Sequence, residues 1–187
     1  MNNQTESQKN RIADAFKKHF MHFGFKKTTV DEVATELGVS KKTIYRYFTS
    51  KDEIFYFIIS RKAEARRIMI EEEITHLGTA KEKLEAMVMI NFEEFRKIHK
   101  KKIKAMDDRF QSEIAARAFS EAFKRLVSDV LSEGVSNKEF EICDLEMTVR
   151  YIQSIITETV KVLREDSEAE PEEFLICTLN KLLMRTS

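Results

Sequence analysis

Residues that interrupt helices are scarce in this sequence. Its 187 residues include four glycines and one proline, too few to supply the turns of an all-β chain. Strong helix formers such as Glu, Lys, Leu, Met and Ala are plentiful. With 42% hydrophobic and 34% charged residues, the chain can bury a packed interior beneath a charged surface, which argues against disorder. We therefore expect an all-α protein.

Cysteine and long apolar runs are also scarce. Cys143 and Cys177 lie far apart without a CxxC or Cys/His spacing, so neither a zinc site nor a disulfide framework is predicted, and we expect buried free thiols. The longest apolar run, IFYFII at residues 54–59, is too short to cross a bilayer, and the polar start MNNQTESQKN lacks the apolar core of a signal peptide. We expect a cytoplasmic protein without a membrane partner.

The motifs of common enzyme classes are missing from the sequence. It contains no Gly-rich phosphate loop, no HExxH motif and no Ser-His-Asp order. His19 and His22 stand three residues apart, but no third metal ligand accompanies them, so they are interpreted as surface or packing residues. We expect no enzymatic activity, no catalytic residues, no metal and no cofactor.

Charge is distributed unevenly along the chain. Lys plus Arg and Asp plus Glu both total 32. Residues 1–62 contain 12 basic and 7 acidic residues, which leaves 20 basic and 25 acidic residues in the remainder. The N-terminal third is therefore the basic end, where a polyanionic partner would bind.

Apolar residues recur at helical spacing between capping signals. Three pairs have the spacing of a capping box: Thr29 with Glu32, Ser50 with Glu53, and Thr79 with Glu82. Glycines at 24, 38 and 78 are typical helix stops. The predicted helices cover about residues 12–23, 30–37 and 41–48, a long segment from 51 past 68, a segment from 80 through 95, then 107–133, 144–164 and a last helix with Pro171 in its first turn.

Two short helices joined by a tight turn, at 30–37 and 41–48, predict a helix-turn-helix arrangement. Ile44 and Phe48 stand at i and i+4 and would face inward. The residues that then face outward, or flank that side, are Lys42, Thr43, Tyr45, Arg46 and Tyr47. Such side chains suit base edges and phosphate oxygens. The pattern alone fits DNA binding and a solvated surface over a small core equally well.

From about Ile12 to Phe55 the sequence resembles the tetracycline-repressor (TetR) family of bacterial transcriptional regulators. The resemblance is carried by FGFKKTTVDEVATELGVS at 23–40 and KKTIYRYFTSKDEIF at 41–55. The family often has glycine where this chain has Lys42. The resemblance implies a three-helix helix-turn-helix DNA-binding domain at residues 1–52, joined by a long helix to a helical ligand-binding and dimerisation domain at 53–187.

The resemblance also implies roles for individual positions. Helix caps directed at phosphates are Thr29 and Ser40. Residues facing base edges are Lys41, Lys42 and Thr43. Residues that grip the DNA backbone are Tyr45, Tyr47 and Lys51. Arg46 faces the same side, although it has the alternative of pairing with a carboxylate, and the Tyr47 ring has the alternative of packing beside Phe48.

The last two predicted helices are apolar on more than one side, which indicates burial against both the chain's own core and a second subunit. In the resembling family, this is where two subunits form a four-helix interface. The residues expected at the interface are Tyr151, Ile155, Thr159, Val162, Leu175, Leu179 and Leu182. The alternative is a wholly internal last helix.

Met and aromatic residues lie on the helices where the family holds its effector, although such a stripe also fits a plain core. The residues expected to line an effector pocket are Met87, Asn91, Phe92, Phe95, Met106, Phe110, Phe123 and Tyr151. They would accept a small apolar or aromatic molecule.

The sequence thus predicts a homodimeric transcriptional repressor that a small-molecule effector releases from a pseudo-palindromic, double-stranded DNA operator. Two alternatives remain: an architectural or division factor that binds DNA without an effector, and a helical enzyme or protein-interaction module with a degenerate DNA head.

Overall fold

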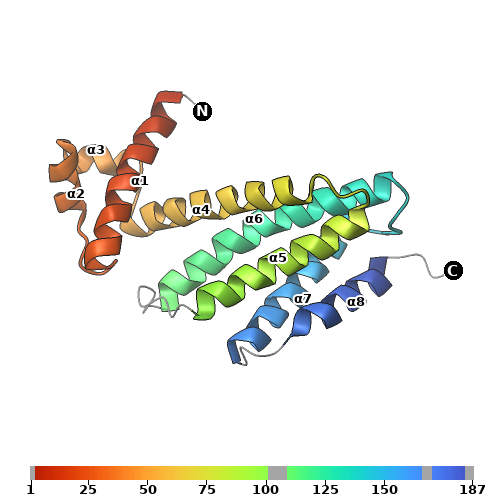
Figure 1. The fold of residues 1–187 in the computed structure, drawn as a ribbon. Coiled ribbons are helices and arrows are strands. Elements are labelled where there is room, and N and C mark those ends of the chain that lie inside the picture. Colours follow the sequence, from red (N-terminus) through yellow and green to blue (C-terminus); the bar gives the residue numbers. More distant parts are fainter. Residues whose placement is uncertain (1–2, 101–108, 166–169, 184–187) are drawn as a thin grey trace. The chain divides into compact units, whose positions relative to one another are not determined.

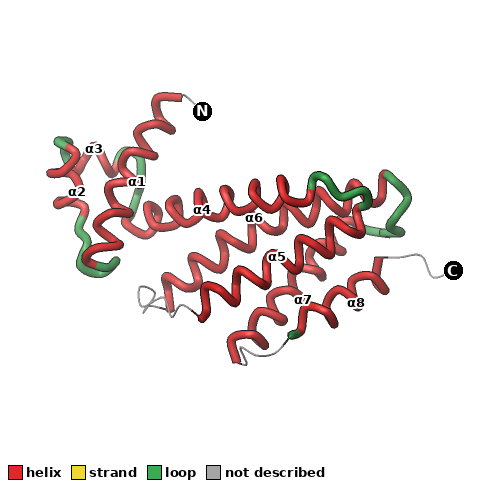
Figure 2. The backbone as a smooth tube through the Cα atoms, in the orientation of Figure 1, coloured by secondary structure: helices red, strands yellow, loops and turns green. Residues whose placement is uncertain are grey.

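The computed structural model describes residues 3–100, 109–165 and 170–183. In these ranges the chain consists of helices and loops without strands, as predicted (Figure 2). The helices are α1 (Asn3–Phe23), α2 (Val30–Leu37), α3 (Lys41–Tyr45), α4 (Lys51–Ile74), α5 (Ala80–Lys100), α6 (Arg109–Ser136), α7 (Leu145–Glu165) and α8 (Pro171–Leu183) (Figure 1). Within the described residues, no helix is long and apolar enough to cross a membrane.

Helix ends largely follow the predicted signals. Gly24 and Gly38 adopt left-handed backbone angles, with φ of 82° and 65°. The capping boxes at Thr29 and Thr79 form as expected. At the start of α4, Ser50 accepts a hydrogen bond from the backbone N–H of Glu53, but the Glu53 carboxylate accepts from Thr49 instead of Ser50.

Two helix predictions differ from the structure. The first helix begins at Asn3, nine residues before Ile12, because the polar segment ahead of the apolar pattern is also helical. The α-helical part of α3 ends at Tyr45 instead of Phe48. The backbone N–H groups of Tyr47 and Phe48 both donate to the Ile44 carbonyl, and this tighter turn still brings Phe48 into the core.

Contacts divide the chain into two units. The first contains residues 1–64 and 104–119, and the second contains residues 65–103 and 120–187. The first unit extends beyond residue 52 because the beginning of α4 packs with α1–α3: Ile54 is buried in the same cluster as Phe16 and Ile44. The functional division at residue 52 remains a prediction, since contacts group residues by packing alone.

The second unit has its own apolar core. Its most deeply buried members come from α4 through α8 and include Ile70, Leu84, Leu131, Ile152 and Leu179. Figure 1 shows α7 and α8 side by side, and the two helices are in contact. Cys143 and Cys177 are both exposed free thiols, so the expectation that they are buried is wrong. Neither residue is needed to fill the core.

A partly buried ion pair joins α5 to α8. The Arg96 guanidinium donates to both carboxylate oxygens of Glu172, and only 6% of Glu172 is exposed. Burial alone raises the pKa of Glu172, but the hydrogen bonds from Arg96 and from the backbone outweigh it and hold this pKa below its ordinary value. Farther along the same two helices, the Asn180 amide donates to Glu85 at 2.6 Å. These polar contacts fix how α8 sits on α5.

The turn after α6 is closed by a ring packed on a glycine. The backbone N–H groups of Glu139 and Phe140 both donate to the carbonyl of Gly134, at 2.8 and 3.2 Å. Phe140 is 5% exposed, and a Cβ atom at Gly134 would overlap its ring. Gly134 therefore allows Phe140 to complete the core of the second unit.

We expect Gly134→Ala to lower the free energy of unfolding by about 1–3 kcal/mol, because the added methyl group must displace Phe140 or the helix backbone. Urea unfolding followed by circular dichroism measures this change. Gly78→Ala is the matched control, since a Cβ there meets only a Glu82 carboxylate oxygen at 3.7 Å, and its effect should stay within about 0.5 kcal/mol. Equal effects of the two substitutions would contradict the packing argument.

Candidate DNA-binding interface

The turn between α2 and α3 is held by local hydrogen bonds. The Gly38 N–H donates to the Thr35 carbonyl at 3.1 Å, and the Val39 N–H donates to the Ala34 carbonyl at 3.0 Å. Ser40 then caps α3: its hydroxyl accepts from the Thr43 N–H at 3.1 Å and lies 2.9 Å from the Thr43 hydroxyl. This is the tight, glycine-containing connection that the sequence predicted between the two helices.

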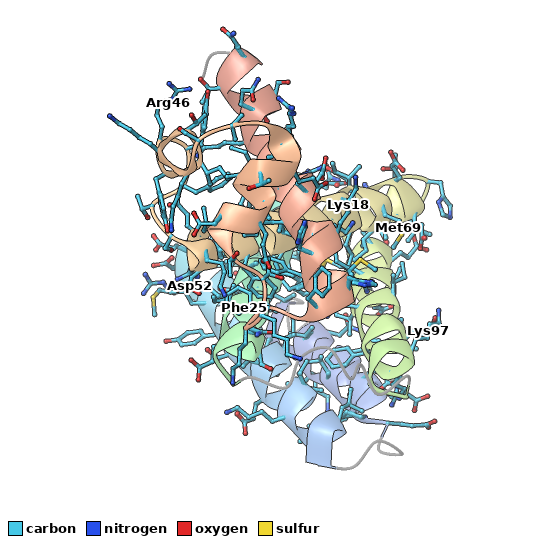
Figure 3. All side chains as sticks on the ribbon, turned by 90° about the vertical axis from the view of Figure 1, so that its left-hand side faces the viewer. Lys18, Phe25, Arg46, Asp52, Met69 and Lys97 are labelled. Atoms are coloured by element: carbon cyan, nitrogen blue, oxygen red, sulfur yellow. The ribbon has the colours of Figure 1, made fainter. Side chains whose placement is uncertain are left out.

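Burial decides which side of α3 faces solvent. Ile44 is fully buried and Phe48 is 1% exposed, and both pack with Phe16 of α1 and Val33 of α2. The side chains left on the outside include those of Lys42, Tyr45 and Arg46, all exposed, whereas Thr43 is half-buried. Figure 3 shows Arg46 at the outer edge of this unit. A small polar and basic surface results, of the kind that binds phosphates and base edges.

Lys41 is engaged by an acidic residue that the sequence analysis did not assign. Its ammonium lies 2.8 Å from the carboxylate of Asp31, in the first turn of α2, and both side chains are largely exposed. The hydrogen bond and charge of Asp31 raise the pKa of Lys41 above its ordinary value. Such an exposed pair is weak, worth about 0–1 kcal/mol, and is readily exchanged for a phosphate contact.

Arg46 and Tyr47 interact with each other. The Arg46 guanidinium donates to the Tyr47 hydroxyl at 3.2 Å and lies 5.0 Å from the centre of the Tyr47 ring. The Tyr47 ring is half-buried and packs against the core of the first unit, as the structural alternative for this residue anticipated. These contacts of Arg46 are with the Tyr47 side chain, whereas the alternative that the sequence left open was a carboxylate.

Carboxylates occupy the first turns of α2 and α4. Hydrogen bonds from the backbone N–H and the hydroxyl of Thr29 lower the pKa of Glu32, and the same groups of Thr49 lower the pKa of Glu53. The Thr29 hydroxyl lies 2.8 Å from Glu32 and is therefore already bonded within the protein. A phosphate bound at Thr29, as predicted, would have to share the Thr29 hydroxyl with the Glu32 carboxylate.

Lys51 also has protein partners. Its ammonium donates to the carbonyls of Phe25 and Thr28, at 2.8 and 3.2 Å, and lies 4.3 Å from the centre of the Phe25 ring. Sequence periodicity did not reveal this arrangement, because Lys51 is 23 and 26 residues from its acceptors. The turn that it contacts carries Lys26 and Lys27, two exposed residues that were not among the predicted site residues.

His19 links α1 to α2. Its Nε2 atom lies 2.6 Å from a carboxylate oxygen of Glu36. His22, which the sequence placed beside it as a candidate partner, is exposed. Among the described residues, no group of three His, Cys, Asp or Glu side chains is arranged to hold a metal ion.

The residues predicted to line an effector pocket lie in different surroundings. Met87 and Phe92 are completely buried in the core of the second unit, and the half-buried Phe123 packs against it. Asn91 is half-buried, whereas Tyr151 is 61% exposed and does not line the interior. Met106 and the side chains of Phe95 and Phe110 fall outside the described part of the structure.

A surface groove of about 550 Å³ lies between α6 and α7. The residues that line it are all polar or charged: Ser120, Arg150, Gln153, Ser154, Thr157, Glu158 and Lys161. The Gln153 amide crosses it and donates to the carbonyl of Ser120 at 3.2 Å. A lining of this kind does not match the apolar pocket that the sequence predicted.

The predicted dimer-interface residues fall into three groups, which are buried, half-buried and exposed. Leu175 and Leu179 are at most 2% exposed and belong to the chain's own core, so their side chains are not on the surface that a second subunit could cover. Ile155 and Thr159 are half-buried. Large apolar side chains that are exposed on α7 and α8 are Met147, Tyr151, Val162, Phe174 and Leu182. Met147 and Phe174 were not predicted.

Both the helix-turn-helix segment and most of the chain are similar to known regulators. Residues 12–56 match the family model described as bacterial regulatory proteins, tetR family. A two-helix motif with an exposed basic surface on its second helix is the arrangement of a helix-turn-helix DNA-binding domain, and the match over residues 12–56 confirms that this domain resembles that of the TetR family of bacterial transcriptional regulators.

Two curated relatives are from Bacillus subtilis (strain 168). An uncharacterized HTH-type transcriptional regulator, YhgD, is 29% identical over 148 residues, which span 75% of this chain and 76% of the relative. A fatty acid metabolism regulator protein is 27% identical over 155 residues, 80% of each chain. The crystal structure of FadR from Bacillus subtilis in complex with stearoyl-CoA matches with a TM-score of 0.57 and 22% identity, covering 92% of this chain and 95% of that chain. At this identity the structural match supports the fold.

We expect Lys42 and Tyr45 to contribute to DNA binding by different routes. Tyr45→Phe removes a hydroxyl that suits phosphate, so it should weaken binding to all sequences similarly. Lys42→Ala should change the preference at one base position by about 1–3 kcal/mol, the size of a guanine contact. Binding of each variant to a library of duplexes measures both effects. A uniform loss for Lys42→Ala would contradict a base-reading role.

Proposed function

We propose that the protein is a homodimeric repressor that binds a pseudo-palindromic operator and leaves it when an apolar-tailed effector binds the second unit. The proposal depends mainly on one observation: the chain contains both a helix-turn-helix motif and an exposed apolar surface on α7 and α8. With five residues, α3 is long enough to read only one half-site, so tight binding would require a second copy.

The exposed surface on α7 supports self-association. Met147, Tyr151 and Val162 are 38%, 61% and 42% exposed, and their spacings of four and eleven residues place them along one face of the helix. On α8, Phe174 and Leu182 are 78% and 58% exposed. Large apolar side chains on adjacent helices of this kind are typical of a protein–protein interface.

The class of effector is proposed from the relatives. The 27% identical protein is a fatty acid metabolism regulator, and stearoyl-CoA is the ligand bound in the matching FadR structure. A long acyl chain also requires an apolar interior, and Met87 and Phe92 are fully buried members of the core of the second unit. Stearoyl-CoA is therefore the first compound to test.

One alternative keeps support from the structure. Met87 and Phe92 are each 0% exposed, and such close packing favours a DNA-binding architectural factor that needs no effector. The two functions differ in one measurable respect, which is whether any ligand changes the affinity for DNA.

We expect Tyr151→Glu and Leu182→Glu to shift the protein from dimer to monomer, because each places a charge in the proposed interface while leaving the chain's own core intact. Operator affinity should fall with the loss of the second head, since two half-sites about 34–36 Å apart must be bound together. Sedimentation velocity measures the assembly state. Met69→Glu, at a 41% exposed position on α4, is the matched control. A monomeric unsubstituted protein would rule out the dimer.

We also expect stearoyl-CoA and operator DNA to weaken each other's binding. An effector that favours the form unable to bind DNA by about 3 kcal/mol lowers operator affinity roughly 100-fold, and linkage requires the same factor in the reverse direction. The operator is first selected from genomic fragments, and calorimetry then measures ligand affinity with and without it. Coenzyme A without an acyl chain is the control. Equal ligand affinity in both titrations would exclude this compound as the effector.

A further inference from the structure

The first residue of α4 contacts the turn between α1 and α2. Gly24 ends α1 with φ of 82°, and the N–H and hydroxyl of Thr28 both donate back to the Gly24 carbonyl. The carbonyls of Phe25 and Thr28 instead accept from the Lys51 ammonium, at 2.8 and 3.2 Å. Lys51 therefore bridges two points of the turn that lie three residues apart.

The same ammonium is covered by an aromatic ring. Its nitrogen lies 4.3 Å from the centre of the Phe25 ring. Phe25 is itself anchored, with ring centres 5.1 Å from Phe20 of α1 and 5.2 Å from Phe55 of α4. In the view of Figure 3, Phe25 lies at the opposite end of the first unit from Arg46. Lys51 is thus held by two carbonyl acceptors and a fixed aromatic face.

These contacts leave Lys51 poorly placed to serve a phosphate. An ammonium has three N–H donors, and two of them are directed at backbone carbonyls. Turning the side chain toward DNA would break two charge-assisted hydrogen bonds and leave the half-buried Phe25 and the buried Thr28 without this donor. The contacts are therefore those of a residue that shapes the turn.

The turn leads directly into the helix-turn-helix motif. Lys26 and Lys27 are exposed, Thr28 is 1% exposed, and Thr29 caps α2. Fixing Phe25 and Thr28 on either side of the two lysines fixes the direction in which Lys27 leaves the backbone beside the start of α2. An exposed lysine beside the start of a helix is suited to contact a phosphate, and such a contact depends on where the backbone holds the side chain.

We propose that Lys51 is a positioning residue for DNA binding: it fixes the α1–α2 turn so that Lys27 contacts a phosphate, and it does not itself neutralise one. The inference rests on the DNA binding of the family and concerns contacts that are independent of the operator sequence. A mixed-sequence duplex is therefore a sufficient probe, since phosphate contacts dominate non-specific binding.

The test is the salt dependence of duplex binding between about 50 and 200 mM KCl. Log K falls as log salt rises, and each phosphate contact adds about 0.9 to the absolute value of this slope, which is the value compared among the variants. Lys27→Gln should lower the slope by about 0.9, and Lys51→Met should lower it equally, because the displaced turn loses the same contact. The double variant should show no further decrease. Lys62→Gln, at an exposed position farther along α4, is the control and should leave the slope unchanged.

A combined decrease of about 1.8 in the double variant would overturn the proposal, because it would mean that Lys51 and Lys27 each neutralise a phosphate. An unchanged slope for Lys51→Met would also overturn it. If Lys51→Met does not fold, Thr28→Val provides the test: it removes the hydroxyl bond to Gly24 and no charge. We expect it to lower the slope as well, and an unchanged slope for Thr28→Val would overturn the role of the turn.

Discussion

The burial of Ile44 and Phe48 is the constraint on which the DNA-binding surface depends. A helix of five residues is too short to be stable alone, so α3 exists because these two side chains pack against α1 and α2. The same packing leaves the opposite side of the helix to Lys42, Tyr45 and Arg46. Core formation and presentation of the basic surface therefore depend on the same packing in this unit.

Much of the first unit could be predicted because its signals are local. Helix spacing identified the inward positions, and the capping pair at Thr29 and Glu32 and the left-handed Gly38 are short-range features that sequence order displays directly. The contacts that could not be predicted join residues far apart in the chain. Lys51 with Phe25 and Lys41 with Asp31 are separated by 26 and 10 residues, and their pairing depends on how the helices meet.

In the second unit, helical spacing was not sufficient to predict which residues are buried. Its last helix is apolar on several sides, and spacing alone does not say which side faces the chain's own core. Leu175 and Leu179 prove to be internal, whereas Phe174 and Leu182 are exposed. The helical spacing of Met87 and Phe92 likewise identified them as inward-facing without distinguishing a packed core from a ligand pocket, because both are lined by the same side chains. That distinction depends on volumes, which sequence patterns do not contain.

The partly buried pair of Arg96 and Glu172 has a consequence for how this protein can evolve. Replacing Arg96 alone leaves the buried Glu172 carboxylate without this cation, which is far more destabilising than replacing both with apolar residues of similar size. Neutral drift at Arg96 is therefore blocked until Glu172 has changed. Homologous chains should carry the two residues together or lose them together, and the correlation between these two columns would record the contact between α5 and α8.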